Sequence, residues 1–190
     1  VAIADVVHHA MVLPMTAALV LAVAPRLAQA QKALVYCPVS VDASGCTIAK
    51  AALTATFPGG VETGFDGTAG TVDLKTVDLF QYSVFVVPSL AETDSTAPYA
   101  LLRDPAVVGR LKLALIGRRA FWSGTPDQGV LATTRPLKDV LIQNLAAWAS
   151  GAFATVNAPG LVVLQDNSDD VTRRYSWVQP ITGLNIVADS

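Results

Sequence analysis

Histidine is almost absent from this chain of 190 residues, because His8 and His9 are its only two histidines. No histidine occurs from Gln31 to Ser190. Imidazole is the base of a Ser-His-Asp triad, the usual general base near neutral pH and a frequent zinc ligand. The absence therefore excludes a histidine-based triad, histidine-assisted zinc hydrolysis and imidazole base catalysis from this region acting alone.

Charged residues are also scarce, at 15% of the chain, and the net charge is −2. Nucleic-acid-binding domains normally carry a basic stripe, whereas Arg118-Arg119 and Arg173-Arg174 are isolated pairs, so we expect no nucleic-acid partner. Hydrophobic residues make up 52% of the chain and the mean hydropathy is +0.47. After Gln31, however, no stretch approaches the roughly 18 uninterrupted apolar residues of a membrane-spanning helix.

The longest apolar run is MVLPMTAALVLAVAPRLAQAQ, at residues 11–31. Its ending, Ala28-Gln29-Ala30, is typical of a signal-peptide cleavage site, which predicts cleavage after Ala30 and export to the periplasm, cell surface or medium. The first ten residues contain Asp5 and no Lys or Arg, although export signals begin with basic residues. The alternative is an uncleaved anchor helix over roughly residues 6–24, interrupted by Pro14.

From Lys32 onward, short apolar runs alternate with helical patterns, as in βαβ units with a parallel sheet. Strands are expected at residues 33–36, 61–65, 83–87, 119–122 and 161–164, with a sixth at 184–187. Helices are expected at residues 47–56, 106–115 (after the capping pair Asp104-Pro105), 136–149 and just after Ser168. The third of these places Leu137, Leu141, Leu145 and Trp148 on one apolar face.

This pattern predicts an α/β domain over residues 31–190, following the signal or apolar segment at residues 1–30. The expected architecture is a doubly wound, mostly parallel sheet of five or six strands in three layers, with the flavodoxin-like strand order 2-1-3-4-5. The chain ends at Ser190 with no closing helix, which favours a piece of a longer exported protein. Its expected partners are the neighbouring domains of that protein or an unidentified small ligand.

A doubly wound sheet binds ligands at the carboxyl ends of its strands, which selects the loops at residues 37–46, 88–94, 123–129 and 165–170. Five carboxylates fall in these loops: Asp42, Glu92, Asp94, Asp127 and Asp166. Two of them could hold Ca²⁺ or act as an acid/base pair on a sugar; alternatively they cap helices and turns. Trp122 and Trp177 could stack on a sugar or belong to the core.

Cys37 and Cys46 are the only cysteines, and they flank the first of these loops. Because exported proteins fold in an oxidising compartment, we predict that the two form a disulfide. The alternative is that Cys46, close to a helix N-terminus, is a reactive thiol. That role would lack a histidine base.

The turn Ser44-Gly45-Cys46-Thr47 enters a helix after a strand and resembles the hydroxyl-rich phosphate loop of flavodoxins. In that family backbone amides and hydroxyl groups hold a phosphate at a helix N-terminus. The resemblance covers only this turn. It implies that Ser40, Ser44, Gly45 and Thr47 contact a phosphate or flavin; alternatively, they form a capped helix start.

The segment Arg119-Ala120-Phe121-Trp122-Ser123-Gly124-Thr125 has the strand-then-turn context in which class I glutamine amidotransferase-like domains carry their nucleophile. Residues 84–90 resemble that superfamily's strand ending in a Pro-Ser loop. The family's motif requires a cysteine flanked by glycines and a later histidine-glutamate pair, and this chain has neither. Ser123 stands in the cysteine's place without an activating base, so the resemblance implies a relative without catalytic machinery.

These patterns together predict a non-catalytic binding or structural module of an exported protein, without cofactor or metal. Two alternatives remain. One is a hydrolase of carbohydrates or esters that uses the loop carboxylates or Ser123, and the other is a phosphate or flavin binder at the first loop. The candidate ligand-binding residues are Ser40, Asp42, Ser44, Gly45, Thr47, Ser89, Glu92, Ser123, Thr125 and Asp127.

Overall fold

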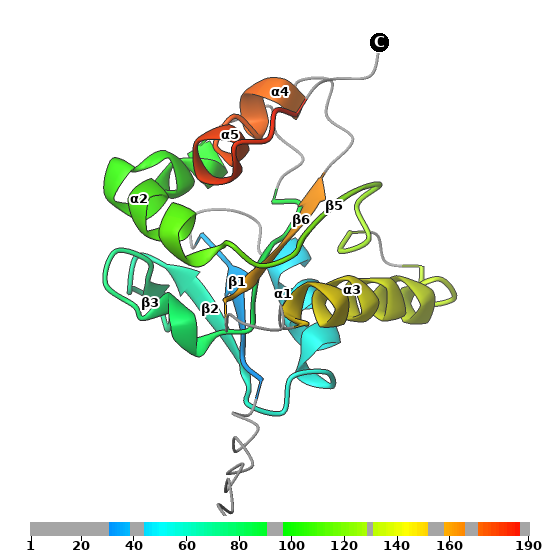
Figure 1. Cartoon of the computed structure of the whole chain (residues 1–190). Coiled ribbons are helices and arrows are strands. Elements are labelled where there is room, and N and C mark those ends of the chain that lie inside the picture. The colour runs from blue at the N-terminus through cyan, green and yellow to red at the C-terminus, as the bar shows by residue number, and fades with distance from the viewer. Residues whose placement is uncertain are drawn as a thin grey trace, which may run out of the picture.

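The computed structural model describes residues 31–38, 44–90, 97–128, 131–151, 158–165 and 171–186, with backbone only for Ser44 and Val171. A six-stranded sheet forms its centre (Figure 1). Its strands are β1 (Ala33–Tyr36), β2 (Val61–Phe65), β3 (Val72–Asp73), β4 (Val84–Val87), β5 (Arg119–Ser123) and β6 (Gly160–Gln165). All pairings between these strands are parallel, in the order β3-β2-β1-β4-β6-β5.

Helices cover both faces of the sheet, which confirms the predicted three-layer α/β class (Figure 1). One face carries α1 (Ser44–Thr54) and α3 (Arg135–Ser150). The other carries α2 (Pro105–Ala114), α4 (Val171–Arg174), α5 (Val178–Thr182) and the short 3₁₀ turns η1 (Leu79–Gln81), η2 (Ala97–Tyr99) and η3 (Leu101–Arg103). In the described ranges no helix is long and apolar enough to cross a bilayer.

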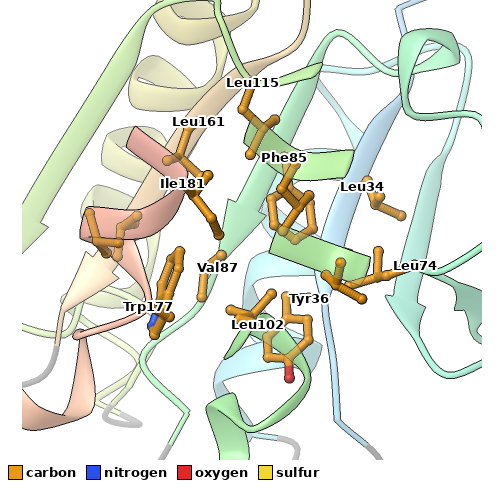
Figure 2. Packing of buried hydrophobic residues seen from close by; sticks show 14 of the residues in the cluster. Leu34, Tyr36, Leu74, Phe85, Val87, Leu102, Leu115, Leu161, Trp177 and Ile181 are labelled. Carbon is orange, nitrogen blue, oxygen red and sulfur yellow. The ribbon is translucent and has the colours of Figure 1, made fainter. Parts of the chain in front are cut away.

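The strands at the centre of the sheet are apolar along their whole length because both of their faces are covered. Every residue of β1 and β4 is buried. Alternation along β1 sends Leu34 and Tyr36 to the α2/α5 side, and Ala33 and Val35 to the α1/α3 side. Figure 2 shows the first of these two cores, in which Trp177 and Ile181 also pack.

The predicted order of the last two strands is wrong. β6 lies next to β4, and β5 forms the edge of the sheet. The physical reason lies in the composition of the two strands. The first five residues of β6, in GLVVLQ, are buried, whereas β5 carries the partly exposed Arg119 and the exposed Trp122 and Ser123, which an edge tolerates.

The sixth strand is not where we expected it. Residues 184–186 form no strand and Val187 lies outside the described residues, whereas Val72–Asp73 adds β3 beside β2. The predicted cap at Asp104 is confirmed, because its carboxylate accepts a hydrogen bond from the Ala106 amide at 2.9 Å and Pro105 opens α2. The helix expected from residue 47 begins earlier, at Ser44.

Helix α3 packs on the sheet through a different face from the one that the leucine pattern suggested. Its fully buried apolar residues are Ile142, Ala146 and Ala149; of the expected face, Leu145 is partly buried against the core, whereas Leu137 and Trp148 are exposed. Small residues let the helix approach the sheet closely, since a methyl group at Gly160 would lie 2.2 Å from the Ala149 carbonyl oxygen. The helix therefore has a second apolar face, directed away from the sheet.

Candidate functional site

Three loops at the carboxyl ends of β1, β4 and β5 bring together Gly45, Ser89 and Asp127, here called the carboxyl-edge cluster. The Ser89 amide donates to Asp127 Oδ2 at 2.7 Å, and Ser89 Oγ donates to Oδ1 at 2.6 Å. Gly45, in the first turn of α1, lies directly against them: a methyl group there would be 2.6 Å from Oδ2 and 2.8 Å from the Ser89 carbonyl oxygen. Three of the predicted site residues are thus in one place.

Burial governs the electrostatics of this cluster, because Ser89 is 1% exposed and Asp127 is fully buried. Desolvation raises the pKa of the Asp127 carboxyl above its usual range, and it outweighs the opposing effects of the Ser89 hydrogen bonds and of Arg135. Both carboxylate oxygens accept hydrogen bonds from one residue. The pair therefore fastens the loop after β5 to the loop after β4.

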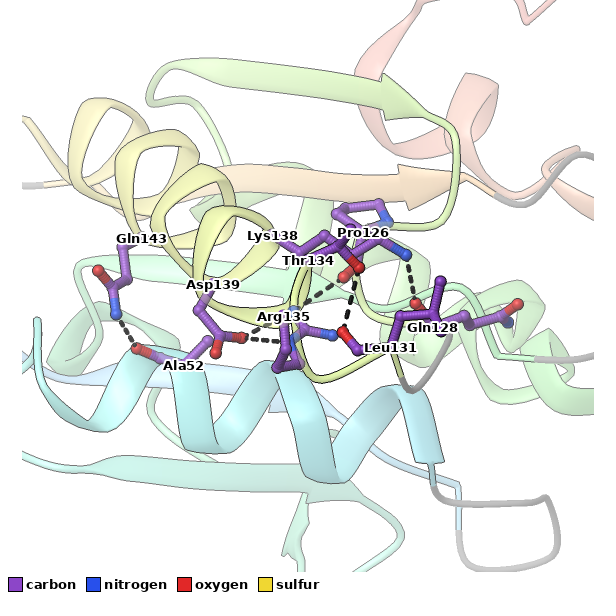
Figure 3. A network of polar contacts seen from close by, with 9 residues as sticks. All are labelled: Ala52, Pro126, Gln128, Leu131, Thr134, Arg135, Lys138, Asp139 and Gln143. Atoms are coloured by element: carbon purple, nitrogen blue, oxygen red, sulfur yellow. Dashed lines mark hydrogen bonds and ion pairs between the residues drawn. The ribbon is translucent and has the colours of Figure 1, made fainter.

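The backbone on each side of Asp127 is held by side chains of α3 (Figure 3). Arg135 Nη2 donates to the Pro126 carbonyl at 2.9 Å, and Lys138 Nζ donates to the Gln128 carbonyl at 2.7 Å. Gln128 Nε2 in turn donates to the Ser89 carbonyl at 3.0 Å. Sequence reasoning missed Gln128, Arg135 and Lys138; the one available signal was the Arg135–Asp139 spacing of four, which forms an ion pair at 2.7 Å.

A tight turn directs Asp127 back over the sheet. Gly124 has φ +105° and Thr125 has φ +48°, a left-handed conformation that costs energy for a residue with a Cβ. The Gln128 amide then closes the turn on the Thr125 carbonyl at 3.0 Å. Thr125, a candidate ligand contact, shapes this turn through its backbone.

The predicted disulfide is confirmed: Cys37 and Cys46 are bonded, with their Cα atoms 5.6 Å apart. Both residues are buried and belong to the α1/α3-side core. The bond joins the end of β1 to the first turn of α1, next to Gly45. The reactive-thiol alternative for Cys46 therefore has no free thiol in this structure.

The remaining predicted residues do not converge on the cluster. Thr47 is exposed on α1, and Ser123 is exposed at the end of β5, with no hydrogen bond from its hydroxyl to any described residue. Trp122 is 42% exposed, whereas Trp177 is fully buried in the core and has no exposed ring face on which a sugar could stack. Only the backbone of Ser44 is described. Five expected sites lie outside the described residues, namely Ser40, Asp42, Glu92, Asp94 and Asp166.

Within the described part of the chain, no three or more acidic, cysteine or histidine side chains group as metal ligands would. Comparison with protein-family models, curated proteins and solved structures finds no match. The flavodoxin-like and amidotransferase-like resemblances therefore stay predictions drawn from the motifs alone.

Proposed function

We propose that this chain is a non-catalytic binding or structural module of an exported protein. The observation that supports this proposal is the burial of the Ser89–Asp127 pair. Burial raises the pKa of the Asp127 carboxyl. Because catalytic acids and bases in clefts often have shifted pKa values, Asp127 is the described loop carboxylate that most needs to be tested for a catalytic role. Here both carboxylate oxygens of Asp127 accept hydrogen bonds from Ser89, and both residues are buried, so a substrate could not reach them.

The same cluster weighs against a phosphate or flavin site at the first loop. A phosphate held as in flavodoxins would lie at the N-terminus of α1. The Asp127 carboxylate already lies against Gly45 in that turn, so an ionised Asp127 would repel a phosphate there. The disulfide closes the base of the same loop.

The hydrolase alternative requires an activated nucleophile or two cooperating carboxylates. Ser123 is exposed and has no described hydrogen-bond partner for its hydroxyl, and a serine without a base is a poor nucleophile near neutral pH. Asp127 is directed into the protein and pairs with Ser89 rather than with a second carboxylate.

Export is the second part of the proposal, and the apolar run before Ala30 together with the Cys37–Cys46 disulfide supports it. The full chain should be expressed in a bacterial host and its N-terminus sequenced after fractionation. We expect the exported product to begin at Gln31. Recovery of the intact chain in membranes would favour the anchor alternative, and recovery in the cytoplasm would contradict export.

A fluorophosphonate probe tests the absence of catalysis. The folded protein should remain unlabelled, colourless and inactive on generic ester and glycoside substrates. Stoichiometric labelling that disappears in Ser123→Ala, or turnover that disappears in a folded Asp127→Asn variant, would overturn the proposal in favour of a hydrolase. A yellow purified protein would instead indicate a flavin binder.

A further inference from the structure

The edge of the sheet at β5 has backbone groups that pair with no described strand. Among the described strands, β5 has β6 as its one neighbour. The Leu161 amide donates to the Arg118 carbonyl at 2.8 Å, so alternation along the strand turns the backbone of Ala120 and Trp122 toward β6. The amides and carbonyls of Arg119, Phe121 and Ser123 consequently face away from the sheet. Such an edge is a template for another strand.

Exposed apolar side chains flank this edge on both faces of the sheet. On the α2/α5 side, Ile116 is 52% exposed and Leu184 is 46% exposed, and Arg119 joins their segments by donating to the Thr182 carbonyl at 2.8 Å. On the other side are Trp122 of β5 and Trp148 of α3, and the Arg118 guanidinium lies 5.5 Å from the Trp148 ring centre. These side chains add exposed apolar surface beside the outward-facing backbone groups of the strand.

The outer face of α3 carries further exposed apolar side chains. Leu137, Val140 and Trp148 are 74%, 49% and 52% exposed, and they lie opposite the buried Ile142 and Ala146. The charged residues of α3 are engaged within the chain: Arg135 pairs with Asp139, and Lys138 donates to the Gln128 carbonyl. The helix thus presents an apolar face without an unpaired charge.

We propose that two copies of this chain associate by antiparallel pairing of their β5 edges, around a two-fold axis at Phe121. The strand has five residues, and its central residue is one of the three whose backbone faces outward. Two-fold pairing places Phe121 opposite Phe121 and Arg119 opposite Ser123, so every outward-facing residue meets an outward-facing partner. The surface is self-complementary, as an isologous interface requires.

The side chains of β5 fit the same register. Trp122 lies opposite Ala120 of the second copy, which places the largest side chain of the strand against a small one on the α1/α3 face. Phe121 lies opposite Phe121 of the second copy on the α2/α5 face. Arg119 is the only charged residue of the strand and lies opposite Ser123, so no like charges face each other across the axis.

The choice of a second copy as the occupant rests on this fit of Trp122 against Ala120 and on the absence of like charges opposite each other. The inference is independent of the proposed function, since an enzyme could dimerise in the same way. It predicts one continuous sheet that crosses the two-fold axis.

The experiment measures the association of the purified, folded protein by sedimentation equilibrium, for the wild type, Ser123→Pro and the matched control Ser123→Ala. Proline removes one outward amide from each copy without removing an amide that bonds to β6. We expect the wild type and Ser123→Ala to dimerise alike, and Ser123→Pro to weaken dimerisation about tenfold or more, since two backbone hydrogen bonds are lost per dimer.

Circular dichroism establishes that Ser123→Pro is folded, and amide exchange gives a second measurement that needs no variant. Exchange at Phe121 and Ser123 should slow as the protein concentration rises. A wild type that remains monomeric would overturn the proposal. Association that Leu137→Lys abolishes and Ser123→Pro leaves intact would also overturn it, by assigning the contact to the α3 face alone.

Discussion

The carboxyl-edge cluster and the β5 edge are connected by a few residues of the same chain, yet their interactions are opposite in kind. In the cluster, the Asp127 carboxylate accepts from both the amide and the hydroxyl of Ser89, and the neighbouring carbonyls accept from α3 side chains. Along β5, every second residue has outward backbone groups, and Trp122 is 42% exposed. The polar side chains of the cluster are enclosed and hydrogen-bonded to each other, whereas the backbone groups and the Trp122 and Ser123 side chains of β5 are open to solvent.

Together with the proposed pairing of β5 edges, this difference predicts that stability and association depend on different residues. The cluster ties together three loops whose strands are not all neighbours, because β5 is separated from β4 by β6. Substitutions there should therefore alter the free energy of unfolding. Substitutions at the exposed Ser123 of β5 should leave stability nearly unchanged and alter association, whereas Ala120 and Phe121 also pack against the cores.

The largest expected effect is that of Asp127→Ala, which should lower the free energy of unfolding by about 3 kcal/mol. It removes two hydrogen bonds and leaves the buried Ser89 amide without its acceptor. Ser123→Ala, at the end of β5 just before this turn, is the control; because its side chain is exposed, we expect a change within about 0.5 kcal/mol. Urea unfolding measures both. Equal effects would remove the distinction between the two regions.

Loss of the disulfide should have the next largest effect. The double variant Cys37→Ala/Cys46→Ala should lose about 2.5 kcal/mol, mainly because its unfolded chain is no longer restricted. Reductant should destabilise the wild type by a similar amount and leave the double variant unchanged. A wild type that is insensitive to reductant under unfolding conditions would show that the bond is absent or does not contribute.

Gly45→Ala should cost about 2 kcal/mol, because its methyl group would collide with the Ser89 carbonyl and the Asp127 carboxylate. Gly109→Ala in α2 is the matched control, since nothing lies within 4 Å of the methyl group it would add. Alanine is the better helix former, so this control should be neutral or stabilising by up to about 1 kcal/mol. If Gly45→Ala changed the free energy of unfolding as little as Gly109→Ala, the result would contradict the close contact of Gly45 with Ser89 and Asp127.

The sequence predicted the central strands well because each is a continuous apolar run. Residues 33–36 form β1 as expected, and β4 differs from its predicted range only at Ser83. Strand order was harder to predict, since an apolar run shows that a strand is buried but not which strands lie beside it. The partly polar composition of β5 was the available signal for its place at the edge.

The candidate site was predictable only as a set of loops. Topology selected four loops, and those after β1, β4 and β5 contribute to the cluster, while most of the loop after β6 lies outside the described residues. Pattern could not select Asp127 among five loop carboxylates, because its partner Ser89 lies 38 positions away in the chain. Gly45 was expected to approach a ligand closely, but the group it approaches belongs to the protein itself.

The smallest expected effect is a pH dependence that belongs to Asp127. Because burial raises the pKa of this carboxyl in the folded protein, the folded state holds the proton more tightly than the unfolded state does. The resulting stabilisation is fully present below the unfolded pKa, about 4, and is lost as the pH rises through the raised folded pKa. Asp127→Asn does not titrate, so it lacks this contribution.

The free energy of unfolding should therefore be measured for the wild type and Asp127→Asn between about pH 3 and pH 8, where the other carboxylates contribute equally to both. We expect the wild type's stability relative to the variant to decline as the pH rises from about 4, by about 1.4 kcal/mol for each unit by which the folded pKa is raised. A relative stability that increases with pH would mean that the Ser89 hydrogen bonds outweigh burial. The cluster would then stabilise the ionised form of Asp127. In that case the feature that distinguishes it from β5 would be a buried charge, rather than a carboxyl that burial tends to neutralise.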